Sequence, residues 1–244
     1  MTRVSSWVLL VAVAASAQSE AELERMVHAA PEDAQAWRQL GLARISANRL
    51  PAAAEALERA CELERAPGDS CYFLARNYHA MADYETARLA FHKALRKAPA
   101  SMASQVHRAA GLNYAALGRD EETERHLRRA AESNAGGAQD ARVDLGAFLF
   151  RQGRLEEARR ILDSAVRSRP DSPRANLESG RVLLQVGELA EAVKRLEKSV
   201  QTNPSDWSAH LLLGRAYQRM GRDEDAAREL KLGESGWRRS QPSN

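Results

Sequence analysis

Aromatic residues, cysteines and long apolar runs are all scarce in this chain of 244 residues. Phe, Trp and Tyr together make up 5% of the sequence, whereas a single compact core of this size usually draws on more large and β-branched side chains. Ala, Leu, Arg and Glu dominate instead, and these are strong helix formers. The composition argues against a sheet-based fold and is typical of helices that pack closely through small side chains.

A strong excess of one charge sign is also missing. The chain has 36 basic and 33 acidic residues, so its formal net charge is only +3. This balance gives no support to nucleic-acid binding. Charge placement matters more here than charge total.

The motifs of catalytic and metal centres are absent from the sequence. None of the six histidines lies in an HExxH arrangement or pairs with cysteine at metal-ligand spacing. The sequence contains no GxSxG motif, phosphate-binding loop or dinucleotide fingerprint. Acidic pairs such as Glu121-Glu122 and Glu156-Glu157 recur at expected helix starts, where they favour the helix dipole. We therefore predict a protein that is not an enzyme and uses neither metal nor cofactor.

The first residues have the layout of a secretory signal peptide. Arg3 precedes an apolar run from Trp7 to Ala15, and Ala15-Ser16-Ala17 provides small residues for a signal peptidase. A helix needs roughly 20 apolar residues to span a bilayer, so this run is too short. We expect residues 1–17 to be removed and the chain to be exported, periplasmic or secreted, without a later membrane span. The alternative is a short uncleaved membrane-bound helix.

Four similar stretches repeat along the second half of the chain: GRDEETERHL from Gly118, GRLEEARRIL from Gly153, GELAEAVKRL from Gly187 and GRDEDAAREL from Gly221. Each combines a glycine turn, an acidic first helical turn and an apolar stripe. A further helical segment with its own small residue precedes each stretch. The period is about 34 residues with two helices per period, which indicates a helical repeat protein.

This pattern resembles the tetratricopeptide repeat (TPR) family, in which W-x2-L-G-x2-Y is followed by A-x3-F and then P. Three sets of positions carry the resemblance. Small residues in the first helices are Gly41, Ala75, Gly111, Gly146, Gly180 and Gly214; small residues in the second helices are Ala53, Ala87, Ala158, Ala192 and Ala226; repeat-ending prolines are Pro99, Pro170 and Pro204. Small side chains at these positions let the two helices of each repeat approach closely.

The resemblance implies an all-α fold, an α-solenoid that winds as a right-handed superhelix of about six helix-turn-helix TPR units. Six repeats cover residues 34–236, and residues 18–33 form a leading half-repeat helix, which gives thirteen helices in all. Gly233 and Gly236 are expected to break the last helix, so that residues 237–244 form a polar tail. The third repeat departs from the pattern at Thr123, and extra residues fall in the loop at Pro99–Ser104.

Cys61 and Cys71 are the two cysteines, ten residues apart. Cys61 falls near the end of one expected helix and Cys71 falls in the next. Because successive helices pack together, we expect the pair to lie close enough to form a disulfide in an oxidising compartment. The spacing is not that of a zinc or thioredoxin-like motif. Two separate buried thiols are the alternative.

In the TPR family the first helices line a concave groove that holds peptides. By this resemblance, eight arginines and four other side chains lie on or near the groove, against four acidic residues at equivalent places, Asp69, Asp140, Asp144 and Glu178. The expected groove residues are Arg38, Tyr72, Phe73, Arg76, His79, Arg108, Phe150, Arg151, Arg174, Arg181, Arg215 and Arg219. The alternative is an arginine-rich composition that is spread over every face.

The carboxylate clamp of chaperone-binding relatives is not supported. Of the corresponding residues Arg38, Leu42, Phe73, Gln105 and Ala109, only Arg38 is similar.

The function that this resemblance implies is a protein-protein interaction scaffold. An acidic partner protein or peptide would lie in the groove, in the periplasm, where the chain assists assembly of an envelope or secretion complex. Two alternatives remain: a structural subunit that uses its outer face, and a polymer- or glycan-binding module. The latter needs an aromatic platform, for which Tyr72, Phe73 and Phe150 are few.

Overall fold

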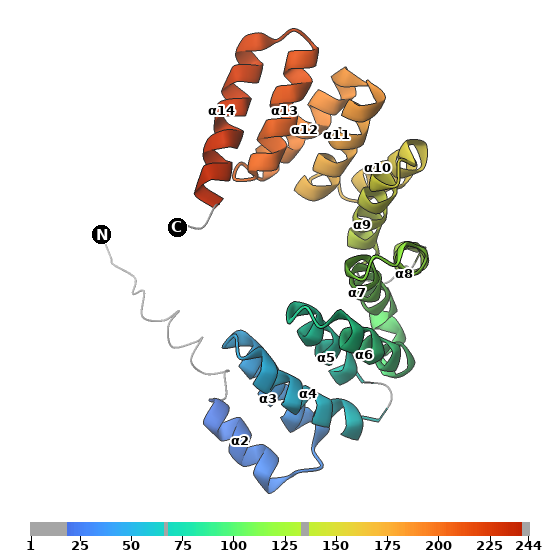
Figure 1. Cartoon of the computed structure of the whole chain (residues 1–244), viewed down its shortest axis with the longest axis vertical. Helices are drawn as coiled ribbons and strands as arrows, with labels where there is room; N and C mark the ends of the chain where they lie inside the picture. Colours follow the sequence, from blue (N-terminus) through green and yellow to red (C-terminus); the bar gives the residue numbers. More distant parts are fainter. Residues whose placement is uncertain (1–18, 66–67, 133–136, 241–244) are drawn as a thin grey trace, which may run out of the picture. The chain divides into compact units, whose positions relative to one another are not determined.

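The computed structural model describes residues 19–65, 68–132 and 137–240, and this part of the chain is all α-helical (Figure 1). The expected signal peptide at residues 1–17 lies outside it. The thirteen α-helices of the described ranges are α2 (Glu20–Ala29), α3 (Ala34–Ser46), α4 (Leu50–Leu63), α5 (Ser70–Ala80), α6 (Tyr84–Lys97), α7 (Ala103–Ala116), α8 (Asp120–Glu132), α9 (Ala138–Arg151), α10 (Leu155–Ser168), α11 (Pro173–Val186), α12 (Leu189–Thr202), α13 (Trp207–Arg219) and α14 (Asp223–Ser240).

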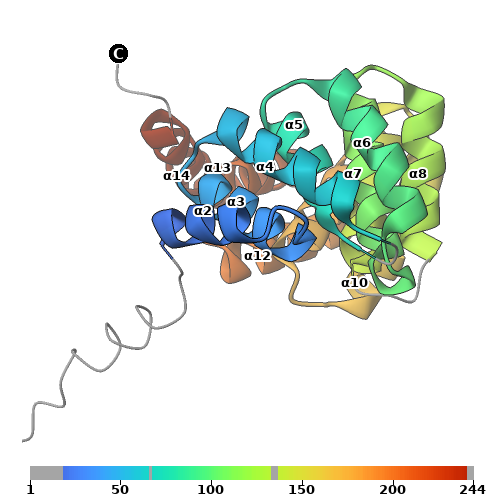
Figure 2. The same cartoon turned by 90° about the horizontal axis from the view of Figure 1, so that it is seen from below.

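The helices fall into two compact units, residues 1–118 and residues 119–244. In the first unit each helix from α2 to α7 packs against the next; Figure 2 shows α2, α3 and α4 side by side. The second unit continues the same succession from α8 to α14, and Figure 1 shows its pairs α11–α12 and α13–α14. The chain is therefore a TPR-like α-solenoid built from sequential helix pairs.

First helices of successive repeats also contact one another within each unit. In the second unit α11 lies against both α9 and α13, and in the first unit α5 lies against both α3 and α7. Among the described residues the backbones of successive second helices, such as α10 and α12, do not approach one another in this way. The first helices therefore line the inner side of each unit, as the TPR resemblance predicts.

Close contact between glycine and leucine holds the two helices of a repeat together. A Cβ atom added to Gly146 would lie 2.4 Å from Cγ of Leu162, and one added to Gly180 would lie 2.6 Å from Cγ of Leu196. Leu162 and Leu196 are fully buried. The sequence-based explanation of these small residues is thus confirmed, since any side chain at either glycine would displace its leucine.

The turn between the paired helices needs a left-handed backbone. Gly153 adopts φ 74° there, a conformation that glycine takes without cost. In the second repeat the equivalent residue is Ala82, which has φ 60° and is exposed. A left-handed alanine is strained by roughly 1–2 kcal/mol, so this turn is weaker than its neighbours. The extra residues before the third repeat form a short 3₁₀ turn, Ala100–Met102.

The last helix is longer than the sequence suggested. Helix α14 runs without interruption through Gly233 and Gly236 to Ser240, so the expected helix break and the start of a polar tail at residue 237 are wrong. The two glycines allow close packing against α13. A Cβ atom added to Gly233 would lie 2.6 Å from Cδ2 of Leu211, and one added to Gly236 would lie 2.7 Å from Cβ of Trp207. Contact with α13 therefore keeps α14 helical past Gly233 and Gly236, although glycine is a poor helix former. Residues 241–244 lie outside the described ranges.

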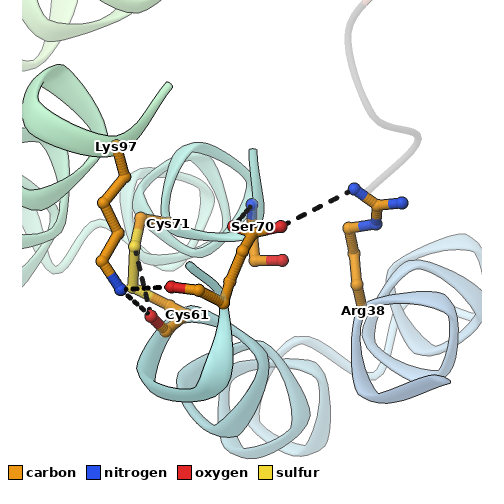
Figure 3. The surroundings of a disulfide bond; sticks show 6 residues. Arg38, Cys61, Ser70, Cys71 and Lys97 are labelled. Carbon is orange, nitrogen blue, oxygen red and sulfur yellow. Dashed lines mark hydrogen bonds and ion pairs between the residues drawn. A yellow bond between two sulfur atoms is a disulfide. The ribbon is translucent and has the colours of Figure 1, made fainter. Parts of the chain in front are cut away.

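Cys61 and Cys71 are joined by a disulfide with their Cα atoms 4.7 Å apart. The bond links the end of α4 to the start of α5 and therefore connects the first two repeats (Figure 3). Lys97 reinforces the same junction, because its ammonium group donates hydrogen bonds to the carbonyl oxygens of Cys61 (2.6 Å) and Glu64 (2.9 Å).

Candidate binding groove in the second unit

A cavity of about 680 Å³ lies along the first helices of the last three repeats. It receives Phe150 from α9, three residues from α11 and seven from α13. We call it the groove cavity; its lining residues are Phe150, Arg181, Leu184, Gln185, Trp207, Ser208, Leu211, Leu212, Arg215, Gln218 and Arg219. Since α9, α11 and α13 are first helices, the cavity lies on the side of the unit where the TPR resemblance predicts a groove.

Helix α13 contributes most of the lining, and hydrogen bonds at its start and on its buried side fix its position. Asp206 caps its start by accepting hydrogen bonds from the backbone N–H groups of Ser208 (3.0 Å) and Ala209 (3.4 Å). On its buried side the Tyr217 hydroxyl donates to Glu197 of α12 at 2.6 Å. Burial, together with this carboxylate, raises the pKa of Tyr217 to about 12, so the phenol stays protonated and keeps donating. The groove face of α13 is therefore presented on a fixed helix.

The charges in the groove cavity are of one sign. Its lining has three arginines and no acidic residue. Arg181 forms an ion pair with Glu178 at 3.4 Å, and Arg219 donates a hydrogen bond to the carbonyl oxygen of Leu184. Arg215 is exposed and has no ion-pair partner among the described residues. The lining is thus suited to a ligand that brings its own negative charge.

Four of the twelve groove residues expected from the sequence meet in this cavity: Phe150, Arg181, Arg215 and Arg219. Two others, Arg151 and Arg174, belong to the same unit but do not line it. The Arg174 side chain instead pairs with the buried carboxylate of Asp144. Pairing of this kind removes much of the positive excess that the residue count suggested.

The remaining expected residues belong to the first unit, where several are already engaged. Arg38 pairs with Asp69 and lies 3.8 Å from Glu64. Tyr72 is a buried core residue rather than a free groove surface, and Arg76 lies over its ring at 5.6 Å.

The other first-unit candidates are also held by neighbours. His79 hydrogen bonds to Asn113 at 3.0 Å, Phe73 packs on the core at 5.5 Å from the Tyr72 ring, and Arg108 is half-buried with a partner of its own. All six residues belong to the first unit, and each of those described above has a neighbour within that unit.

The apolar part of the lining is not among the residues that the sequence predicted. Leu184, Trp207, Leu211 and Leu212 carry it, together with the polar residues Gln185, Gln218 and Ser208. A signal for some of them was present, because Leu184 stands one 34-residue period after Phe150. Trp207 carried no such signal, since it falls outside the TPR pattern.

Two findings on the described residues bear on other kinds of site. Within the described ranges, no cluster of three or more His, Cys, Asp or Glu side chains is arranged to hold a metal ion. None of the helices described is both long and apolar enough to cross a membrane.

Three family models of the tetratricopeptide repeat match the sequence. The first covers residues 114–178 and 183–234, the second residues 10–70 and the third residues 68–100. Together they cover most of the chain, which therefore belongs to the tetratricopeptide repeat family. Members of this family are protein-binding scaffolds and typically have no enzymatic activity. No curated protein matches the sequence significantly.

Solved TPR structures share the fold at low sequence identity. Pseudomonas aeruginosa pilF is 20% identical with a TM-score of 0.73, over 85% of this chain and 93% of that one. YrrB, a TPR protein with an unusual peptide-binding site, is 22% identical with a TM-score of 0.59, over 78% and 97%. MamA from Desulfovibrio magneticus RS-1 is 18% identical with a TM-score of 0.59, over 72% and 100%. At these identities the likeness concerns the fold alone.

Proposed function

We propose that this TPR scaffold binds an extended, acidic segment of a partner protein in the groove cavity of its second unit. The observation that carries the proposal is the lining itself: three arginines, no acidic residue and an apolar wall in one cavity of about 680 Å³. The peptide-binding site of YrrB, a TPR protein with a similar fold, supports a peptide segment as the kind of ligand. Arginine suits carboxylates because its planar guanidinium donates two parallel hydrogen bonds.

Affinity in such a site comes from many modest contacts. An exposed ion pair contributes only about 0–1 kcal/mol, so the apolar wall at Phe150, Leu184 and Leu211 must supply much of the remainder. The ionic part weakens with salt, because the Debye length falls from about 10 Å at 0.1 M to 3 Å at 1 M. An extended ligand that crosses α9, α11 and α13 collects contacts from three repeats.

Charge reversal tests the proposal. The variant R181E/R215E is compared with R129E/R160E, which changes net charge by the same amount at exposed second-helix positions. Arg128 is unsuitable as a control, because it pairs with both Glu124 and Glu157. Each variant is used to capture partners from the native cell envelope, followed by quantitative mass spectrometry. We expect partners lost by R181E/R215E alone; equal retention or equal loss in both variants contradicts the proposal.

We further propose that the chain acts outside the cytoplasm, in the periplasm, and assists assembly of an envelope or secretion complex. Arg3, the apolar run after it and Ala15-Ser16-Ala17 support export. The Cys61–Cys71 disulfide is in keeping with an oxidising compartment. Mass spectrometry of the natively expressed protein tests this: we expect an N-terminus at Gln18, and an intact cytosolic form beginning at Met1 would refute it.

A further inference from the structure

The fifth and sixth repeats have arginines at equivalent positions, but only the arginine of the fifth repeat has a counter-ion on its own helix. Arg181 and Arg215 stand one 34-residue period apart, and both line the groove cavity. In the fifth repeat Glu178 precedes Arg181 by one helical turn and pairs with it at 3.4 Å. In the sixth repeat the position of Glu178 is taken by Leu212. Arg215 therefore lacks the internal counter-ion that the preceding repeat provides.

The fourth repeat also has an acid at this position. Asp144 stands one period before Glu178, is buried, and pairs with Arg174. The acids of the fourth and fifth repeats thus each pair with an arginine of α11. The sixth repeat alone among these three replaces the acid by leucine and leaves an exposed arginine next to it.

An apolar wall adjoins this arginine. Leu211, Leu212 and Trp207 all come from α13 and line the same cavity. Trp207 is not required by the repeat, because the tryptophan of the TPR pattern corresponds to His210 in this repeat. The guanidinium of Arg215 and the apolar wall lie on one helix within about 12 Å along its axis, since an α-helix rises only about 1.5 Å per residue.

We propose that the sixth repeat determines the specificity of the groove by recognising an acidic residue next to a bulky apolar one. Arg215 pairs with the ligand carboxylate, and Leu211, Leu212 and Trp207 hold the apolar side chain. The apolar side chain excludes water from the ion pair and so strengthens it. The inference rests on the proposed function and narrows it: acidic charge alone is not enough, and the apolar neighbour must accompany it.

Two opposite substitutions test the idea without touching an arginine. L212E gives Arg215 the counter-ion that Arg181 has, while E178Q removes the counter-ion of Arg181. L89E and E224Q are matched controls, since Leu89 and Glu224 are exposed on second helices outside the groove. The probe is a fluorescein-labelled ten-residue peptide of alternating Glu and Leu. Comparison peptides replace Glu by Gln or Leu by Ala, and thermal unfolding of each variant verifies folding.

We expect the Glu-Leu peptide to bind wild type about two- to fivefold more tightly than either comparison peptide. L212E should weaken this binding by about two- to fivefold and E178Q should strengthen it, relative to L89E and E224Q. If wild type does not prefer the Glu-Leu peptide, or if L212E and E178Q match their controls, the inference is overturned. The proposed groove is judged separately, by the R181E/R215E capture experiment, and stands if that variant alone loses partners.

Discussion

The backbone of Gly146 lies against the side chain of Leu162, and no space for a methyl group remains between them. We predict that G146A lowers the free energy of unfolding by about 1–3 kcal/mol, because the new Cβ would push into a fully buried leucine. Urea denaturation measures the loss. In the double variant G146A/L162A the space is restored, so adding G146A to L162A should cost much less than adding it to wild type. Equal costs in the two backgrounds would contradict direct contact.

Ala82 occupies a left-handed turn position where the first repeat has Asn48 and the last four repeats have glycine. We predict that A82G raises the free energy of unfolding by about 1 kcal/mol, since glycine adopts the left-handed conformation without strain. Ala82 is exposed, so no buried contact is lost. The control is A227G at an exposed position inside α14, which should lower stability by about 1 kcal/mol. A loss of stability in A82G would show that the turn is not strained.

The Cys61–Cys71 disulfide closes a short loop between the first two repeats. Thiol quantification on denatured, unreduced protein should find no free thiol, and reduction should release two per chain. Replacing both cysteines by alanine should lower stability by about 2–3 kcal/mol, as expected for a loop of this length. Two free thiols before reduction would rule out the bond.

Acid should weaken the contact between α8 and α10. Glu124, Arg128, Arg154 and Glu157 form a closed ring of ion pairs. Burial opposes ionisation of Glu124, but hydrogen bonds from Arg154 and Arg128 outweigh it and lower its pKa below the ordinary 4.5. The hydrogen bond from Arg128 has the largest influence on Glu157 and lowers its pKa as well.

A glutamate with a lowered pKa stabilises the fold above the pKa it has in the unfolded chain, and this stability is lost as the pH falls through the folded-state value. We therefore predict that E124Q/E157Q is less stable than wild type at pH 7, and that the difference shrinks as the pH falls below 4.5. Urea midpoints across this range provide the measurement, with the exposed pair E55Q/E121Q as control. A difference that does not change with pH would rule out the ionic contribution.

Much of the fold could be predicted because TPR packing is local. Gly146 and Gly180 identify the close helix contacts from sequence alone, since each repeat buries its own leucine against its own glycine. The end of the chain could not be predicted in this way. Gly233 and Gly236 are helix breakers by propensity, yet α13 lies so close that Leu211 and Trp207 favour a continuous helix at that point. Tertiary contact outweighs local preference there.

The candidate site was predicted only in part, for a different reason. Periodicity indicates which helices face the groove, and three of the residues it grouped, Arg181, Arg215 and Phe150, line one cavity. Periodicity does not reveal which arginines are already paired, because Asp144 and Glu178 reach their partners through side-chain geometry. Periodicity also does not identify Trp207, because the TPR pattern specifies no residue type at that position.

Site-specific photo-crosslinking tests the central claim, that a partner lies on the first helices of the second unit. A photoreactive amino acid is placed at Gln185 or Gln218, two exposed residues of the groove cavity, and separately at Lys194 or Ala227, exposed residues of second helices. After irradiation in the native cell envelope, we expect a discrete crosslinked partner from Gln185 and Gln218 and none from Lys194 and Ala227. Crosslinks from the second helices alone, or equally from all four positions, would contradict the account.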